Sequence, residues 1–342
     1  MRKIDDLSFE ELKEAMLKIN EPKFKASQIF DWIHNKTVDS FEDMTNVSQK
    51  TNTELKKEYE FTKAKIELKL ESKLDETKKY VIKFEDGNIV ESVFLKYKFG
   101  NTACISSQVG CKMGCHFCAS TKNGFIRNLT SAEMLKQIYL IQNDTKEKIS
   151  NVVIMGSGEP LENYDNIVRF LDIINDEKGQ NISMRKITLS TSGIVPNIYK
   201  LADENIPITL AISLHAPTQE KREQIMPIAR KYQLPDVLKA CDYYVKTTGR
   251  RLTFEYIMIK GFNDSQEDAI ILSKILKNKL ANVNLIPCNY VKEANTKPSG
   301  DLDIMKFKKV LADNGINATV RRELGSDINA ACGQLRNDLL KM

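Results

Sequence analysis

The feature that most constrains the fold is a repeated alternation of strand-like and helix-like segments in the later part of the 342-residue chain. From about Cys104 onward, a β-branched run, a Gly or polar break and an amphipathic segment recur about six times, roughly 25 to 35 residues apart. Such alternation favours parallel strands joined by right-handed crossovers. We therefore predict an α/β fold, a partial β/α (TIM-like) barrel of about six strands. An open doubly wound sheet is the alternative, because repeat spacing does not show whether the sheet curls.

The residues before this region follow two other patterns. From Ser8 to about Glu60, apolar residues recur three and four positions apart, and Ser8 with Glu11 has the pattern of a capping box. This predicts a small helical N-terminal domain over residues 1–64. Over residues 65–100, apolar and polar residues alternate, and Asp86-Gly87 is typical of a tight hairpin turn. This predicts a β meander that links the helical domain to a core domain over residues 101–342.

Composition limits the class of protein. The N-terminus lacks the apolar core of a signal peptide, and no apolar span reaches membrane length, so we expect a cytoplasmic protein. Cytosolic thiols are kept reduced, so clustered cysteines indicate a metal or redox site before a disulfide framework. The net charge of +5, from 51 basic and 46 acidic residues, is compatible with a polyanionic partner but does not require one.

Four of the seven cysteines fall in one short stretch, CISSQVGCKMGCHFCAS. Cys111, Cys115 and Cys118 have the spacing C-x3-C-x2-C in a predicted loop, and thiolates this close together bind soft or borderline metals. A structural zinc ion prefers four ligands in two separated pairs, whereas the fourth nearby thiol, Cys104, lies seven residues upstream in a predicted strand. Three ligands suit a [4Fe-4S] cluster with one open iron, which we favour over zinc.

Other polar groups follow the later predicted strands. In a β/α barrel the active site lies at the C-terminal ends of the strands. Small and polar groups at those ends suit a ligand with an amine, a carboxylate and hydroxyls. Each motif alone is weak, because GSGE also serves as a strand-to-helix turn and a single histidine is often a core residue. The residues concerned are Gly158, Glu159, Ser190, Ser213, Leu214, His215 and Asn289.

Together these motifs resemble a known family. A C-x3-C-x2-C motif that heads a β/α barrel and is followed by GSGEP (residues 156–160) is similar to the radical S-adenosylmethionine (SAM) enzymes. More narrowly, the chain resembles the bacterial RlmN-type 23S rRNA and tRNA adenine C2-methyltransferases, and the resemblance runs through nearly its whole length. The motifs that carry it, in order, are FKASQIFDWIH, CISSQVGCKMGCHFCAS, GSGEP, LSTSG, SLHAP, NLIPCN and RRELGSDINAACGQL.

The resemblance implies an enzyme, a SAM-dependent radical RNA methyltransferase. Its target would be C2 of adenosine in 23S rRNA, at the peptidyl-transferase centre, and in tRNA, 3′ to the anticodon. It would use a [4Fe-4S] cluster held by Cys111, Cys115 and Cys118, and two SAM molecules per turnover held by the strand-end residues given above. Besides the two RNAs, we expect a one-electron reductant and a thiol reductant as partners, no membrane, and a monomeric enzyme.

The resemblance also implies three catalytic residues. In the family's scheme one SAM methylates Cys332, and a deoxyadenosyl radical from a second SAM activates that methyl group, which adds to C2 and joins the RNA to Cys332. Glu91 would accept the C2 proton. Cys104 would then attack the Cys332 sulfur, leaving a disulfide that the cytosolic thiol pool reduces. Taken singly, Cys332 is typical of a small buried apolar residue and Glu91 of a solvent-facing strand residue.

Two other functions stay open at this point. A C8-methylating resistance enzyme of the Cfr type would use the same cluster and the same methylated cysteine, although it tends to have Ala where this chain has Pro160. A zinc-stabilised RNA-binding protein is the alternative without catalysis. Basic residues near the predicted strand ends could contact RNA phosphates, but a solvated surface is the default reading for each of them. These residues are Lys112, Lys122, Arg127, Arg321 and Arg322.

Overall fold

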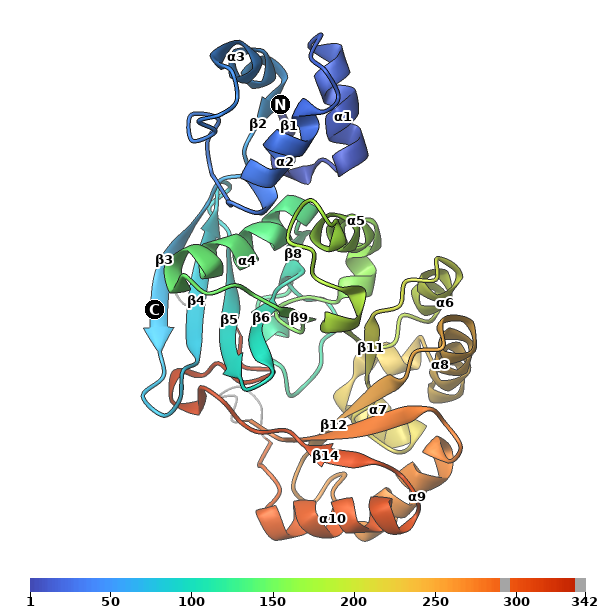
Figure 1. Ribbon diagram of the computed structural model, residues 1–342. Coiled ribbons are helices and arrows are strands. Elements are labelled where there is room, and N and C mark those ends of the chain that lie inside the picture. The colour runs from blue at the N-terminus through green and yellow to red at the C-terminus, as the bar shows by residue number, and fades with distance from the viewer. Residues whose placement is uncertain (290–295, 336–342) are drawn as a thin grey trace.

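The computed structural model describes residues 1–289 and 296–335, and its centre is one curved mixed sheet (Figure 1). The sheet has ten strands, of which those from β6 to β14 are parallel and the other three antiparallel. In sheet order the strands are β14 (Ala318–Val320), β13 (Ala281–Pro287), β12 (Leu252–Met258), β11 (Thr209–Ser213), β10 (Ile187–Thr191), β9 (Asn151–Ile154), β6 (Gly100–Ile105), β5 (Ile89–Tyr97), β4 (Lys78–Phe84) and β3 (Ala64–Glu71).

The strand order decides between the two predicted architectures. The parallel strands lie side by side in chain order, from β6 and β9 through to β14, with no reversal. A doubly wound sheet reverses its strand order at a switch point, so this sheet is wound in one direction only. Its edge strands, β3 and β14, do not pair with each other. The prediction of a partial β/α barrel is therefore confirmed. The short strand β14 is one parallel strand more than the expected six.

Helices follow the parallel strands and lie around the outer side of the sheet, as Figure 1 shows. A capping box forms at Thr130: its hydroxyl accepts a hydrogen bond from the Glu133 N–H, and the Glu133 carboxylate accepts one from the Thr130 N–H. Each helix buries an apolar stripe against the strands. The helices are α4 (Ser131–Thr145), α5 (Tyr164–Asn175), α6 (Val195–Asp203), α7 (Gln219–Ile225), α8 (Leu234–Thr248), α9 (Gln266–Leu276) and α10 (Asp301–Asp313).

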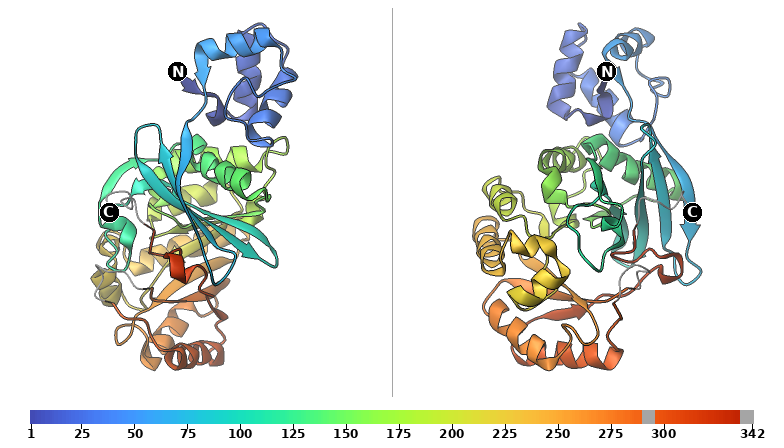
Figure 2. Two further views of the ribbon diagram at one scale, coloured as in Figure 1. Left: turned by 90° about the vertical axis from the view of Figure 1, so that its left-hand side faces the viewer. Right: turned by 180° about the vertical axis from the view of Figure 1, so that it is seen from behind.

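The N-terminal residues form a helical unit at one end of the sheet (Figure 2). It contains α1 (Phe9–Lys18), α2 (Lys25–His34) and α3 (Gln49–Glu58), with the short strands β1 (Arg2–Lys3) and β2 (Tyr59–Glu60) paired in parallel. The capping box predicted at Ser8 and Glu11 is present. The unit contacts the barrel through a buried hydrogen bond of 2.7 Å between His34 Nδ1 and the Tyr139 hydroxyl of α4.

The predicted β meander forms, and it is continuous with the barrel sheet. β3, β4 and β5 are antiparallel, and the β4–β5 turn has Gly87 at a φ of +82°, a left-handed conformation that glycine adopts readily. β5 then pairs with β6, with Val93 opposite Cys104. Cross-strand partners point to the same face of a sheet, so residues of the meander share a face with Cys104.

The last described residues, 321–335, cover that face of the meander. The Gly325 N–H donates to the Asp75 carboxylate at 3.0 Å, and the Lys79 ammonium donates to the Asn329 carbonyl at 3.1 Å. Ala330 and Leu335 form a small apolar cluster with Val93, Leu95 and Cys104. In the described part of the chain, no helix combines the length and the apolar character needed to cross a membrane.

Candidate active site

The three clustered cysteines lie in a loop between β7 (Gln108–Gly110) and β8 (Phe125–Asn128), a pair of short strands that follows β6. Backbone hydrogen bonds hold the loop in place. The His116 N–H donates to the Ile225 carbonyl at 3.0 Å, and the Ala119 N–H donates to the Gly333 carbonyl at 2.7 Å. Gly114, at a φ of +71°, makes the turn between the first two cysteines. The loop is thus tied both to α7 and to the C-terminal segment.

Cys111, Cys115 and Cys118 line one cavity of about 140 Å³ at the C-terminal ends of the strands. Burial raises the pKa of the Cys115 thiol well above its usual value, and the neighbouring charges of Cys118 and Cys111 raise it further. Among the described residues, no three Cys, His, Asp or Glu side chains converge as the ligands of a single metal ion do. Three cysteine thiolates lining one cavity are the kind of ligand set that holds a [4Fe-4S] cluster.

The exit of β9 passes very close to β6 and β7. At Gly158, where φ is +107°, a Cβ atom would lie 2.6 Å from Cβ of Gln108, and at Gly156 it would lie 2.7 Å from the Ile105 carbonyl oxygen. Real Cβ atoms do not approach so closely, so both positions require glycine. The glycines let the next residue, Glu159, enter the cavity wall, where its carboxylate accepts hydrogen bonds from Ser192 N–H at 2.7 Å and Leu161 N–H at 3.1 Å.

The ends of β10 and β11 add two hydroxyls and an imidazole to the same cavity. Ser190 Oγ and Ser213 Oγ lie 3.4 Å apart. His215 Nδ1 accepts a hydrogen bond from the Ile257 N–H at 3.1 Å, which leaves Nε2 as the protonated nitrogen. Burial, with a smaller contribution from the positive charge of Arg222, lowers the pKa of His215 to about 3, so its ring is neutral. His215 therefore presents a neutral imidazole to the cavity rather than a cation.

Two other predicted SAM contacts lie outside this cavity lining. Leu214 is 0% exposed in the main core, and its N–H donates to the Glu255 carbonyl at 3.1 Å. Asn289 lines a neighbouring pocket, where its side-chain amide donates to the Cys332 carbonyl at 2.9 Å. Asn289 therefore contacts the backbone of the C-terminal segment.

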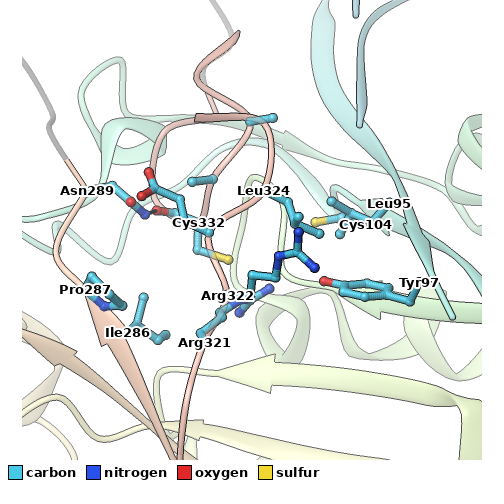
Figure 3. A pocket seen from close by; sticks show the side chains of 13 residues that line it. Leu95, Tyr97, Cys104, Ile286, Pro287, Asn289, Arg321, Arg322, Leu324 and Cys332 are labelled. Atoms are coloured by element: carbon cyan, nitrogen blue, oxygen red, sulfur yellow. Dashed lines mark hydrogen bonds between the residues drawn. The ribbon is translucent and has the colours of Figure 1, made fainter. Parts of the chain in front are cut away.

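That neighbouring pocket, of about 40 Å³, contains both Cys104 and Cys332 (Figure 3). Cys104 comes from β6 and Cys332 from the C-terminal segment, and both are free thiols. Burial raises the pKa of Cys104 to about 12, and a negative charge on Cys332 contributes to that rise, as expected for close neighbours. Cys332 and Arg321 line the pocket and the larger cavity alike, so the two spaces adjoin at these residues.

Arg321 and Glu255 also line the larger cavity, a position that the sequence did not predict for either residue. The Arg321 guanidinium lies 4.0 Å from the Glu255 carboxylate, and the charge of Cys332 is the largest cause that raises the pKa of Arg321. Arg321 directly follows β14, the strand that was not predicted. The sequence could have indicated Glu255 as a site residue, because it is the one carboxylate within the apolar strand β12. Arg321 thus lies where the two spaces adjoin, beside Glu255 and Cys332.

Glu91 lies on β5 and lines neither of the two spaces. The solvent-facing reading of Glu91 is wrong, because its side chain is only 1% exposed. Its carboxylate lies 3.4 Å from the ammonium of Lys79, a residue that also contacts the C-terminal segment. Glu91 is two residues from Val93, the strand partner of Cys104, so it occupies the sheet face that Cys104 occupies.

Two of the remaining basic candidates are engaged in ion pairs. Arg127 makes a bidentate pair with Glu133 at 2.7 and 2.8 Å, and it also binds Asp86 at 2.5 Å. Lys112 lies 2.5 Å from Glu162. Lys122 and Arg322 are exposed, and Arg322 lines the smaller pocket.

Comparison with known proteins gives two family matches. Residues 105–272 match the radical SAM superfamily. Residues 3–61 match a family described as the N-terminal domain of ribosomal RNA large subunit methyltransferases. The first match covers the cysteine loop and the barrel strands β9 to β12, and the second covers the helical N-terminal unit.

Similar proteins match the chain from end to end. A "Probable dual-specificity RNA methyltransferase RlmN" of Clostridium novyi is 52% identical over 341 residues, which cover 100% of this chain and 99% of that protein. The protein of the same name in Clostridium botulinum (strain Eklund 17B) is 54% identical over 341 residues, covering 100% and 98%. The crystal structure of a radical SAM methyltransferase from Sphaerobacter thermophilus superposes with a TM-score of 0.94 at 38% identity, covering 98% of this chain and 99% of that one.

Proposed function

Since this chain belongs to the RlmN family of radical SAM methyltransferases, we propose that it methylates C2 of adenosine in 23S rRNA and in tRNA through a methylated cysteine. The chain is an enzyme that uses SAM and a [4Fe-4S] cluster. The observation that best supports the proposal is the junction of the two spaces. Cys332 lines both the cavity of the three clustered thiols and the pocket of Cys104.

We assign the cofactor-binding roles to the residues of the larger cavity. Cys111, Cys115 and Cys118 would hold the cluster. Glycine backbone, carboxylate, hydroxyl and imidazole groups around them would hold SAM, which together with the cluster supplies the methyl group and the one-electron chemistry. The SAM-binding residues that line this cavity are Gly158, Glu159, Ser190, Ser213 and His215. Leu214 and Asn289, which lie outside its lining, belong to the set by family resemblance.

Cys332 is the proposed carrier of the methyl group. Its position at the junction puts it within reach of a cofactor on one side and of Cys104 on the other. Arg321 places a permanent positive charge beside both sulfurs, and cations near a cysteine favour the nucleophilic thiolate. The side-chain amide of Asn289 holds the Cys332 backbone from the opposite side.

Product release is the proposed task of Glu91 and Cys104. The adenine ring would regain aromaticity when it loses the C2 proton, for which Glu91 is the proposed acceptor, together with one electron, which the oxidised [4Fe-4S] cluster would take up. A thioether then joins the Cys332 sulfur to the carbon on C2. Attack by the Cys104 thiolate forms a bond between the two sulfurs and breaks the sulfur–carbon bond, and the released carbon takes a proton to become the methyl group.

We assign one role to each of the three regions predicted from the sequence. Residues 1–64 would serve as an accessory RNA-binding domain, residues 65–100 as the β meander that carries Glu91, and residues 101–342 as the catalytic core. The match of residues 3–61 to a methyltransferase N-terminal domain supports the first assignment. A one-electron reductant would have to supply electrons to the cluster. A thiol reductant would have to reduce the disulfide between Cys104 and Cys332.

Mass spectrometry of modified nucleosides tests the proposal. 23S rRNA and tRNA from a strain lacking the enzyme are incubated with the anaerobically reconstituted protein, SAM and a reductant. We expect 2-methyladenosine in both RNAs at the proposed positions. Formation of 8-methyladenosine instead would establish the C8 alternative. A colourless protein that carries zinc, lacks iron and leaves the RNA unmodified would contradict any radical mechanism.

A further inference from the structure

Arg222 is a fully buried cation behind the cofactor cavity. It lies on α7, and its side chain is 0% exposed. Its guanidinium donates hydrogen bonds to three backbone carbonyls: those of Ser192 at 2.6 Å, Ser213 at 3.3 Å and Tyr232 at 3.5 Å. Its Nε atom has no hydrogen-bond partner among the described residues. Within the same part of the chain no carboxylate lies within ion-pair distance of Arg222.

A guanidinium buried in this way lowers the stability of the folded protein unless another group balances its charge. A buried charge is normally paired with an opposite charge, because carbonyl dipoles replace only part of the lost hydration. Burial lowers the pKa of Arg222 to about 10, which still leaves the guanidinium protonated at neutral pH. The position therefore calls for a negative group, which no Asp or Glu among residues 1–289 and 296–335 supplies.

The surroundings of Arg222 indicate where that negative group would lie. After burial, which lowers the pKa of Arg222, the charge of Cys115 is the largest influence on it and raises it. α7 contacts the cysteine loop directly, through the hydrogen bond of 3.0 Å from His116 N–H to the Ile225 carbonyl. Met226, the residue after α7, lines the cavity. Two of the three carbonyls that Arg222 binds belong to Ser192 and Ser213, which line the same cavity.

We infer that Arg222 is a positioning residue whose buried positive charge balances the thiolate-bound cluster and raises its reduction potential. The inference rests on the proposed function, in which Cys111, Cys115 and Cys118 bind the cluster. A four-iron cluster with three thiolate ligands is an anion that becomes more negative on reduction. A fixed cation beside it stabilises the reduced form more than the oxidised form, and net charge and hydrogen bonding are known determinants of cluster potential.

The direct test is the midpoint potential of the reconstituted cluster, measured by redox titration followed by electron paramagnetic resonance. In Arg222→Gln, we expect the ratio of reduced to oxidised cluster at a fixed solution potential to fall at least about tenfold, a shift of about 59 mV for a one-electron couple. Arg222→Lys keeps the charge and should stay within about threefold of the parent ratio. Arg230→Gln, an exposed arginine in the next turn, is the matched control and should change nothing.

A second pair of variants leaves Arg222 in place, in case its loss prevents folding. Cys241 on α8 is 0% exposed, takes no part in the proposed chemistry, and is a charge neighbour of Arg222. Cys241→Asp would offer Arg222 a carboxylate partner and so should lower the potential in the same direction. Cys241→Asn has nearly the same shape without the charge, so any difference between the two variants isolates the charge.

The outcomes separate this inference from the proposed function. A parent protein without iron or without 2-methyladenosine formation would overturn the proposed function. A parent with an intact cluster and normal product, but equal potentials in Arg222→Gln and the parent, or in Cys241→Asp and Cys241→Asn, would overturn only the role of Arg222.

Discussion

The release step gives a sharp pH prediction for Cys104. In the proposed reaction, the Cys104 thiolate attacks the sulfur of Cys332 in the enzyme–RNA adduct. The pKa of Cys104 is raised to about 12, first by burial and then by the charge of Cys332, while Arg321 lowers it. At neutral pH the resting side chain is therefore the protonated thiol, which is not the nucleophile.

The expected pH dependence of adduct decay follows from the raised pKa of Cys104. In the adduct the Cys332 sulfur is bonded to carbon and carries no negative charge, so burial remains as the main cause. As long as the pKa of Cys104 lies above the assay range, the thiolate fraction rises about tenfold per pH unit. The rate constant for adduct decay should therefore increase about a hundredfold between pH 7 and pH 9. In Cys104→Ala the adduct should accumulate at every pH.

The assay is a single turnover with radiolabelled RNA, quenched with acid and separated on a denaturing gel, where the adduct migrates with the protein. Cys241→Ala removes an equally buried thiol outside the pocket and should follow the parent profile. Adduct decay that is flat from about pH 7 to pH 9 would refute the role of a buried thiol nucleophile. So would normal decay in Cys104→Ala.

Three further predictions use other contacts of the site. Cys111→Ala should lose iron and form no adduct, whereas Cys104→Ala should retain its iron; equal iron loss in both would contradict the division of roles. Gly158→Ala should lower the free energy of unfolding by about 1–3 kcal/mol and weaken SAM binding, because its Cβ would lie 2.6 Å from Gln108. Gly87→Ala, with a similar positive φ but open space around it, should leave SAM binding unchanged in the same titration. Glu91→Gln should slow 2-methyladenosine formation by about 10²–10⁴-fold, the usual contribution of a positioned base, without loss of iron; an unchanged single-turnover rate would count against Glu91.

Local features of the structure could be predicted from the sequence because they depend on neighbours along the chain. The capping boxes at Ser8 and Thr130 form as their spacing indicates, since a side chain and a backbone N–H three residues apart meet in any helix start. The Asp86-Gly87 turn forms for a similar reason. The cysteine spacing and the repeat of strands and helices likewise pointed to a cluster loop on a partial barrel.

Contacts between distant segments could not be predicted from spacing. A solvated surface was the default reading for Arg321, with phosphate contact as the alternative, but it follows the unpredicted strand β14 and lies beside Glu255 and Cys332. Glu91 has the alternating pattern of a half-exposed strand, yet the C-terminal segment covers its side of the sheet. In both cases the environment of the side chain depends on a segment far away in the sequence.

The sequence by itself determined the parts of this protein: a three-cysteine loop, the polar strand ends, the helical N-terminal unit and, through family resemblance, the identity of its chemistry. Only the tertiary structure decided which parts share a space. It placed Cys104 and Cys332, which the family resemblance had paired, in one pocket, and it left Arg222 buried with no carboxylate partner in the described part of the chain. Spacing along a chain governs helices, turns and loops, whereas burial and charge pairing depend on how the sheet curves and what covers it.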